Sequence, residues 1–355
     1  MKIIKKNKLL YYLESYARFL RPSLDFDDKI TQLVTSLSDT TLEKIRQRVD
    51  YYNQLNQPKE ITKQLQIKDL KHPKTPKVYY FDTYEYARFF DHHSFFDCIF
   101  GDVIHIPDTP SIVKSRPINP NNQNSILLNL DKVRHFVWVK KDIPFSEKKT
   151  LLIGRGAVVQ NHRIDFYRKY FKHPLCNLGQ TNQQGGNPEW IKPKITLKEH
   201  LKYKFILSLQ GNDVATNLKW IMSSNSIAVM PKPTIESWFM EGTLVGGKHY
   251  IEIKPDYSDL EEQLNFYSEN TEICLEILHN AHQHCQQFWN PDIEDLCSLW
   301  VLKNILNTHI TISQGTNKFS HAFLVVSNSF SILYFSKTYS EALFPLFKIS
   351  DGHLS

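Results

Sequence analysis

The pattern of hydrophobic positions is clearest in residues 200–254, where its period changes from that of a strand to that of a helix. Apolar residues alternate over 203–209, the polar turn 210–213 interrupts them, and a helical period follows over 214–222. A short apolar run at 226–230 is closed by prolines and is typical of a buried strand. We therefore predict a βαβ unit whose two strands are parallel.

The turn between this strand and helix has the chemistry of an anion site. Gly211 lets the backbone approach a ligand closely, and Asn212 or Asp213 can cap a helix whose free N–H groups attract phosphate. The next residues supply further donors, of which the last is a cation: Thr216, Asn217 and Lys219. On these residues alone, an ordinary βαβ crossover with a capped helix remains the alternative.

The whole chain divides into four segments by its pattern. Residues 1–75 indicate polar helices punctuated by prolines, 76–145 a first series of strands and helices, 146–310 a second series, and 311–355 a C-terminal segment. The boundary between the two series falls in the charged, proline-containing stretch 141–150. Strands are expected at 77–81, 98–100, 126–128, 136–139, 151–153 and 250–253. Their alternation with helices predicts an α/β fold.

Local signals refine this outline. The elements they predict are a helix at 83–90, a surface loop at 177–194 and helices at 271–288 and 291–306. Ser258 to Glu261 has the pattern of a capping box that opens another helix. The uncharged stretch 322–336 is too short, and too interrupted by Ser and Asn, to span a bilayer.

The basic N-terminal residues 1–20 are expected to form a helix with one of two roles. It is either a cap packed on the first α/β segment or a surface helix that contacts anionic lipid. In the second case the aromatic side chains near the lipid would be Tyr11, Tyr12, Tyr16 and Phe19. Glu14 and Arg18 interrupt the apolar run, so we expect no export signal.

Length and composition narrow the class of protein. A chain of 355 residues exceeds the ~250–300 residues at which one core usually stops growing, so two domains are expected. The net charge of +6 suits anionic partners such as sugar nucleotides, phosphorylated glycolipid or an anionic membrane, without requiring them. The five cysteines are widely spaced and form no C-x-x-C pair, which favours reduced thiols in the cytosol over a disulfide scaffold or a zinc site.

Several ordered sequence blocks resemble glycosyltransferase family 90, over roughly residues 78–300. These blocks are FGDVIHIPDTPSIVKSRPI, GRGAVVQNHRIDFYRKYF, KYKFILSLQGNDVATNLKWIMSSNSIAVMPKP and ESWFMEGTLVGGKHYIEIKPDYSDLEE. The family contains bacterial lipopolysaccharide-core glycosyltransferases, fungal capsule-associated xylosyltransferases and animal protein O-glucosyltransferases. The bacterial group is the most similar, because the animal members are rich in disulfides.

The resemblance implies a GT-B-like fold, with two Rossmann-like domains facing across a cleft and an N-terminal helical cap region at 1–75. Residues 76–145 would form the acceptor-side domain and 146–310 the domain that binds the nucleotide sugar. The implied reaction is an inverting transfer of a hexose, glucose or galactose, from a UDP-sugar to the inner core of lipopolysaccharide or lipooligosaccharide. The alternatives are a capsule or protein O-glycosyltransferase and a non-catalytic protein that binds nucleotide sugar or glycan.

The resemblance also implies a location and a set of partners. The enzyme would be cytoplasmic, with peripheral contact with the cytoplasmic face of the inner membrane, and we expect no nucleic-acid partner. The UDP-sugar is a co-substrate, and we expect neither a cofactor nor an essential metal.

For the catalytic base, the family pattern implies Asp102, which follows a predicted strand. An Asp in this position is also a common turn former, and His105 or Asp108 remains an alternative. The residues that would hold sugar or acceptor from the same segment are Lys114, Ser115 and Arg116.

For the donor, the family pattern implies Arg163 at the diphosphate, with Arg155 and Gly156 shaping the turn beneath the nucleotide. Ala157 stands where other members have Ser, so only its backbone is available. Asn217 stands where animal members have Arg, which leaves more of the charge neutralisation to Lys219 and Arg163. Glu236 would bond the ribose hydroxyls. Alternatively, either arginine pairs with a surface acid such as Asp165.

Two clusters with possible metal ligands have simpler interpretations. Asp25-Phe26-Asp27 has the Asp-x-Asp pattern that glycosyltransferases of the other major architecture use for Mn²⁺ or Mg²⁺, but it precedes every predicted strand. It is expected to be a turn and helix cap. His282, His284 and Cys285 do not share a helix face at i, i+4 spacing and are expected on a solvated helix surface.

Overall fold

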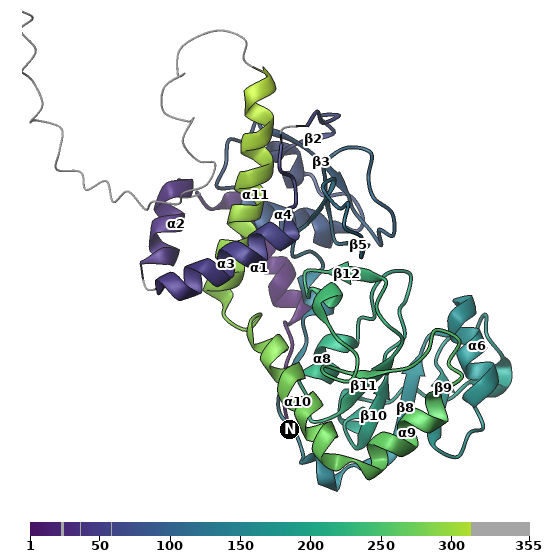
Figure 1. The fold of residues 1–355 in the computed structure, drawn as a ribbon. Coiled ribbons are helices and arrows are strands. Elements are labelled where there is room, and N and C mark those ends of the chain that lie inside the picture. Colours follow the sequence, from purple (N-terminus) through teal and green to yellow (C-terminus); the bar gives the residue numbers. More distant parts are fainter. Residues whose placement is uncertain (23–24, 36, 58, 314–355) are drawn as a thin grey trace, which may run out of the picture. The chain divides into compact units, whose positions relative to one another are not determined.

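The central feature of the computed structural model is a five-stranded parallel sheet. The structure describes residues 1–313 except 23–24, 36 and 58 (Figure 1). The strands of this sheet are β8 (Lys149–Gly156), β9 (Cys176–Gln180), β10 (Tyr203–Leu207), β11 (Ile227–Met230) and β13 (Ile251–Glu252). β10 and β11 run parallel with Phe205 opposite Ile227, which confirms the predicted strand pair. The strands at 151–153 and 250–253 are confirmed as β8 and β13.

The order of these strands is β13-β11-β10-β8-β9. All neighbouring pairs are parallel. Read from the β9 edge, these strands come second, first, third, fourth and fifth along the chain. The direction of winding therefore reverses between β8 and β10. Open α/β sheets bind ligands at the carboxyl ends of the two strands beside such a reversal, and we call this region the crevice. The helices that follow the first three strands are α6 (Asn161–Tyr170), α7 (Leu197–His200) and α8 (Leu218–Met222).

A second sheet has the order β2-β3-β4-β6. Its strands are β2 (Leu65–Gln66), β3 (Phe95–Ile99), β4 (Ser111–Val113) and β6 (Ser125–Leu127), of which the last three are parallel. Two antiparallel pairs join distant segments, namely β1 (Lys2–Ile4) with β7 (Trp138–Lys141) and β5 (Ser115–Pro117) with β12 (Ile235–Ser237). The α/β class is therefore confirmed, with strands near 98–100, 126–128 and 136–139 as predicted.

The remaining helices lie mostly before and after the strands in the sequence. They are α1 (Lys8–Leu20), α2 (Phe26–Val34), α3 (Asp39–Tyr52), α4 (Lys77–Ala87), α5 (Lys132–His135), α9 (Leu260–Glu269), α10 (Thr271–Gln286) and α11 (Pro291–Ser313). Short 3₁₀ turns are η1 (Ile67–Lys71), η2 (Phe145–Glu147), η3 (Pro188–Trp190) and η4 (Glu241–Thr243). The carboxylate of Asp25 accepts from the N–H of Asp27 at 3.0 Å, so the Asp-x-Asp sequence is a helix cap, as predicted.

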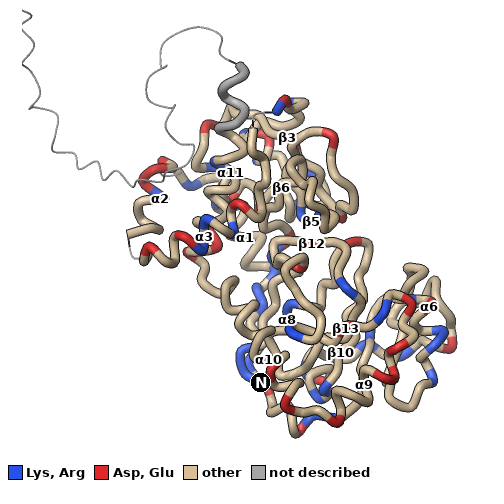
Figure 2. The backbone as a smooth tube through the Cα atoms, viewed as in Figure 1, with Lys and Arg blue, Asp and Glu red and all other residues tan. Residues whose placement is uncertain are grey.

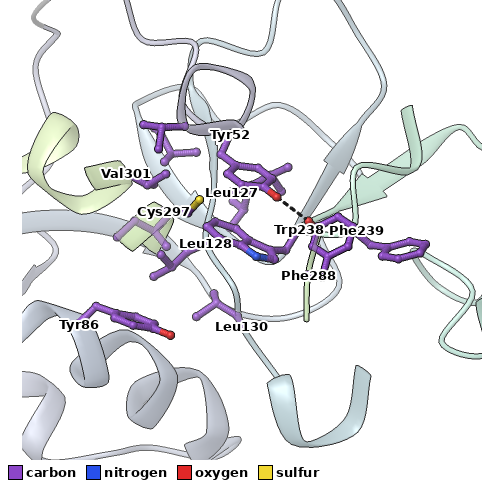
Figure 3. Packing of buried hydrophobic residues seen from close by; sticks show 14 of the residues in the cluster. Tyr52, Tyr86, Leu127, Leu128, Leu130, Trp238, Phe239, Phe288, Cys297 and Val301 are labelled. Carbon is purple, nitrogen blue, oxygen red and sulfur yellow. Dashed lines mark hydrogen bonds between the residues drawn. The ribbon is translucent and has the colours of Figure 1, made fainter. Parts of the chain in front are cut away.

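A buried aromatic cluster joins α3 to the segment after β12 (Figure 3). The rings of Tyr52 and Trp238 stack at a centroid distance of 3.8 Å, and the Tyr52 hydroxyl donates to the carbonyl of Trp238 at 2.9 Å. The indole N–H of Trp238 donates to Glu294 in α11 at 2.6 Å, and Arg48 pairs with the same carboxylate at 2.7 Å. Hydrogen bonds and an ion pair therefore tie α3, the segment after β12 and α11 together through this cluster.

The predicted strand at 77–81 is wrong, because these residues begin α4. Side chains on nearly every side of this helix are buried, including Tyr79, Phe81 and Tyr84. A helix that is buried on nearly all sides lacks an amphipathic period, so its apolar run at 77–81 resembles a buried strand. The helix predicted at 83–90 is the second half of the same element.

Three predicted boundaries also differ from the structure. α8 begins at Leu218 after Asn217, so Asn212 and Asp213 do not cap it and Thr216 precedes it. The Ser258 hydroxyl donates to Asp256, and α9 starts after Asp259 without a side-chain cap, so no capping box forms. The expected loop at 177–194 contains most of β9 and also η3. In the first two cases a polar side chain has another partner than the helix end assigned to it.

The interpretation of His282, His284 and Cys285 as solvated surface is wrong as well. His284 and Cys285 are buried, and the His284 ring bonds the carbonyl of Phe239 at 2.9 Å. Burial lowers the pKa of His284 to about 4, so the ring is neutral at physiological pH. The helices at 271–288 and 291–306 are confirmed as α10 and α11.

No helix in the described residues has both the length and the apolar character needed to cross a bilayer. The predicted segment 322–336 lies outside the described residues. All five cysteines are free thiols, and only Cys176 is not fully buried.

We expect the buried pair of Arg116 and Glu236 to hold β5 and β12 together. Their side chains lie 2.7 Å apart and are almost completely buried. Removing one partner of such a pair leaves an uncompensated charge, so Arg116→Met should lower the free energy of unfolding by about 3–5 kcal/mol. Urea denaturation measures this change. The double variant Arg116→Met with Glu236→Leu removes both charges and should recover much of the loss, and a double variant no more stable than Arg116→Met would contradict this account.

Candidate functional site

A hollow of about 190 Å³ lies at the carboxyl ends of β10 and β11. Its apolar lining comes from Leu209, Val214, Ala215, Leu218, Met230, Pro231, Pro233, Ile235 and Pro255. Its polar lining comes from His162, Ser208, Gln210, Lys232, Thr234, Glu241 and Tyr257. An apolar floor with a few polar groups suits a planar ring that carries hydrogen-bonding atoms.

Arg163 lies beside this hollow, in the first turn of α6, next to the lining residue His162. Its guanidinium donates to three backbone carbonyls, those of Ala157, Leu209 and Gln210, at 2.7–2.8 Å. These carbonyls belong to the segments after β8 and β10, so Arg163 clamps the two sides of the crevice. Among the described residues no carboxylate pairs with it, and Asp165 pairs with Arg168 instead. The positive charge is therefore available to an anion.

Gly211 lies at the same place. A Cβ added to this residue would meet Arg163 Nη2 at 3.7 Å, which is an ordinary contact. Asn212 is exposed, and its side-chain oxygen accepts from Gln160 at 3.0 Å. The turn therefore faces the crevice between the ends of β8 and β10, as an anion site requires, although it is not part of a helix.

Asp102 lies against this turn, on the segment that follows β3. Its carboxylate accepts from Asn212 Nδ2 at 3.2 Å and from the ammonium of Lys114. Lys114 is buried and also pairs with Asp213 at 2.8 Å. One ammonium thus bridges the predicted base and the predicted phosphate turn, which are more than 100 residues apart in the sequence.

The environment of Asp102 keeps its carboxyl group ionised. Partial burial alone would raise the pKa of Asp102, but the hydrogen bond and charge of Lys114 outweigh this effect and lower the pKa below its ordinary value. Burial would likewise lower the pKa of Lys114, and the charge of Asp213 with the hydrogen bond to Asp102 raises it. Both groups remain charged at neutral pH, and Asp102 is in the form that accepts a proton.

The other candidates for the base lie apart from this cluster. His105 and Asp108 are both exposed, on the loop that follows Asp102. The carbonyl of Asp108 accepts from Asn124 at 2.7 Å. Neither residue has a charged partner of the kind that orients Asp102.

Three residues that were predicted to hold the sugar, the acceptor or the ribose are buried inside the protein. Ser115 is fully buried and bonds the backbone of Val103. Arg116 and Glu236 form the ion pair between β5 and β12 described above. These partners tie all three side chains into the interior of the protein, which does not favour the predicted contacts with a ligand.

The predicted cation Lys219 is also buried. Its ammonium pairs with Glu241 at 3.2 Å, behind the wall of the hollow that Glu241 lines. Asn217 is occupied by Ser208 and by the carbonyl of Leu207, whereas Thr216 is exposed. Lys219 therefore balances a buried acid, whereas Arg163 has no carboxylate partner among the described residues.

Arg155 belongs to β8 and faces the neighbouring strand β9. It donates to the carbonyl and side chain of Asn177 at 2.7 and 2.8 Å and does not line the hollow. The carbonyl of Gly156 accepts from Thr181 at 2.9 Å, which fixes the end of the strand pair. Both residues therefore fix the edge at which β8 and β9 pair, and their place beneath a nucleotide stays a prediction.

Sequence reasoning missed most of the lining. The polar groups of His162, Gln210, Lys232, Thr234 and Tyr257 were not singled out, although each follows or adjoins the carboxyl end of a strand. The rule that open α/β sheets bind ligands at these ends would have found His162, Gln210 and Lys232. Tyr257 has a positive φ of 66° and donates to the carbonyl of His162, a conformation that no sequence period indicates.

The described residues contain no group of three or more His, Cys, Asp or Glu side chains arranged to hold a metal ion.

Comparison with known proteins finds a family model that covers the five-stranded sheet. Residues 135–298 match the family model described as glycosyl transferase family 90. The O-glucosyltransferase LpsA of Dichelobacter nodosus is 43% identical over 259 residues, which cover 73% of this chain and 81% of that protein. The O-glucosyltransferase rumi of Drosophila melanogaster is 23% identical over 185 residues, 48% of this chain and 43% of that protein. The uncharacterized protein 179R of Invertebrate iridescent virus 6 is 26% identical over 198 residues.

A parallel sheet with a hollow at its carboxyl edge, beside a carboxylate held ionised, is the architecture of an α/β enzyme. The similarity to LpsA extends over most of both chains, and the family model matches the five-stranded sheet. The chain therefore belongs to glycosyltransferase family 90, and it is a glycosyltransferase.

We expect Lys114→Met to move the acid limb of the pH–activity profile of sugar transfer to higher pH. Lys114 lowers the pKa of Asp102, so loss of the ammonium raises that pKa and the carboxylate becomes protonated at higher pH. The measurement is kcat/KM for transfer against pH. The exposed cation Lys172 provides the control, since Lys172→Met should leave the profile unchanged. An unmoved acid limb in Lys114→Met would show that ionisation of Asp102 does not limit the reaction.

Proposed function

We propose that this chain is an inverting, metal-independent glycosyltransferase that moves a hexose from a UDP-sugar to the inner-core saccharide of lipopolysaccharide or lipooligosaccharide. The observation that carries the proposal is the contact of Asp102 with Lys114 and Asn212 beside the crevice between β8 and β10. It brings a proton acceptor to the edge of a site suited to a nucleotide diphosphate. The reaction would take place at the cytoplasmic face of the inner membrane.

In this proposal the fold is GT-B-like, and the two sheets belong to two Rossmann-like domains. The five-stranded sheet holds the donor, with the uracil ring in the hollow and the diphosphate near Arg163 and the turn at Gly211. A charged guanidinium with free N–H groups offsets the negative charge that develops on the leaving diphosphate. The segment after β3 presents Asp102 to the acceptor.

Asp102 then acts as the general base. Its carboxylate takes the proton from the acceptor hydroxyl while that oxygen attacks the anomeric carbon, and the bond to the UDP leaving group breaks. Attack from the face opposite the diphosphate inverts the configuration. Lys114 orients the carboxylate and keeps it ionised before the acceptor arrives.

For the sugar, glucose is favoured because the relatives of known name are described as O-glucosyltransferases. Galactose is the second candidate, since the two hexoses differ in the orientation of one hydroxyl group. A protein acceptor is the second candidate for the other substrate, because the resemblance to family 90 includes animal protein O-glucosyltransferases and the chain is similar to rumi.

We expect purified wild type to release UDP from one donor in the presence of truncated core lipooligosaccharide, with EDTA added. The donors to compare are UDP-glucose, UDP-galactose and UDP-xylose. Asp102→Asn should lower turnover by roughly 10²–10⁴-fold, because it removes the general base, and it should still bind UDP.

Asp108→Asn is the matched control, since Asp108 is an exposed acid on the same loop. It should retain wild-type turnover. Loss of turnover in Asp108→Asn with retention in Asp102→Asn would reassign the base. Turnover that requires a divalent metal would overturn the metal-independent mechanism.

We expect Arg163→Met to weaken UDP binding by roughly 10–100-fold, because charge-assisted hydrogen bonds to the diphosphate are lost. Calorimetric titration with UDP measures the effect. Arg168→Met removes an exposed arginine from the same helix and should leave the affinity unchanged. The thermal midpoint is recorded for both variants, because Arg163 also clamps backbone carbonyls. Equal UDP affinity in wild type and Arg163→Met would remove Arg163 from the donor site.

A further inference from the structure

Helix α1 has one face that packs on the protein and one that does not. On the inner face the Tyr11 hydroxyl donates to Asp82 at 2.8 Å, and Arg18 pairs with Glu85 at 2.9 Å, both on α4. This packing confirms the prediction that the N-terminal helix caps the first α/β segment. Of the four aromatic residues that the sequence suggested for lipid contact, Tyr11 is buried, Tyr12 and Phe19 are half-buried, and Tyr16 is exposed.

The outer face of α1 carries a stripe of exposed apolar side chains. Its members and their exposed fractions are Leu9 at 69%, Leu13 at 58%, Tyr16 at 44% and Leu20 at 88%. Their spacing of four, three and four residues places them on one side of the helix. Leu10, at 55% exposed, borders the stripe.

This concentration is unusual for the molecule. Of the fourteen large hydrophobic side chains that are exposed in the described part of the chain, seven lie within residues 1–20. Single exposed apolar residues need no explanation, but a contiguous apolar stripe marks a surface that binds something.

The charges that precede the stripe in the chain, and those paired with them on β7, indicate the kind of partner. Residues 1–20 contain five basic residues and one acid, Glu14. Lys2, Lys5 and Lys8 are exposed at the start of this segment. Strand β1 pairs with β7 so that Lys2 lies opposite Lys141, and Lys140 and Lys141 are exposed too. Figure 2 shows this gathering of Lys and Arg beside the N-terminus.

We propose that the outer face of α1 docks on the surface of an anionic phospholipid membrane. The leucine stripe would enter the boundary between headgroups and acyl chains, and the lysines at the start of the chain would meet the anionic headgroups. An amphipathic helix lying in the plane of the interface needs no spanning length. The proposal depends on α1 and its flanking lysines and not on the transfer reaction, so it can fail while the proposed function holds.

The test is co-sedimentation of the full chain with vesicles of phosphatidylethanolamine and phosphatidylglycerol, beside vesicles of phosphatidylcholine. Wild type should bind the anionic vesicles, and added salt should weaken binding. The triple variant Leu9→Ser, Leu13→Ser and Leu20→Ser should lower the partition coefficient by roughly tenfold or more, because three apolar side chains no longer enter the interface.

The matched control carries the same number of exposed apolar-to-Ser changes elsewhere, at Val245, Phe266 and Leu275. It should bind vesicles as wild type does. A charge variant, Lys2→Glu, Lys5→Glu and Lys8→Glu, should also lose binding, whereas the changes Lys172→Glu, Lys194→Glu and Lys198→Glu at exposed positions far along the chain should cost much less. Thermal midpoints and UDP affinity should match wild type in all four variants, which shows that each is folded.

Several results would overturn the proposal. One is failure of wild type to bind anionic vesicles, and another is equal binding by the leucine variant, which would assign lipid contact to a different segment such as 314–355. A third is a change of oligomeric state in sedimentation velocity between wild type and the leucine variant without vesicle binding, which would assign the stripe to contact between two copies of the chain.

Discussion

The buried ammonium of Lys114 is the constraint on which the arrangement of the site depends. It lies between two carboxylates, Asp102 after β3 and Asp213 after β10, and almost none of it is exposed. A buried cation is costly unless it is paired, so the two loops must stay where both carboxylates reach it. The same contact orients the carboxylate of Asp102 and keeps it ionised. One ion cluster thus serves both the packing of the two sheets and the chemistry proposed at their edge.

The charged residues around this cluster are of two kinds. Some are paired inside the protein and support the fold, and others keep a charge that a ligand can use. Arg116 with Glu236 and Lys219 with Glu241 are buried ion pairs, each complete within the protein. Arg163 differs, because it is held by carbonyl groups that orient it without cancelling its charge. A guanidinium fixed in this way is preorganised for an anion, since neither its position nor its hydration must change much on binding.

The sequence allowed the parallel strand pair and the α/β class to be predicted, because short apolar runs are local signals. An anion at the turn of Gly211 remains a prediction. It did not reveal that 77–81 is helical, since a helix buried on all sides has no amphipathic period. Nor did it separate Arg163 from Arg116 and Lys219. Whether a cation faces a ligand or a buried acid depends on partners that are distant in sequence, such as Glu236 and Glu241. The domain boundaries remain a prediction.

The space around two glycines shows which of them the fold itself requires. A methyl group on Gly242 would lie 2.5 Å from Glu236 Oε2 and 2.7 Å from the Tyr51 hydroxyl, so the packed interior requires the absence of a side chain there. Gly211 has no such neighbour, and its backbone is not left-handed. The fold would accept alanine at this position. A requirement for glycine here would therefore arise only when a molecule approaches this backbone closely, as the proposal for the diphosphate implies.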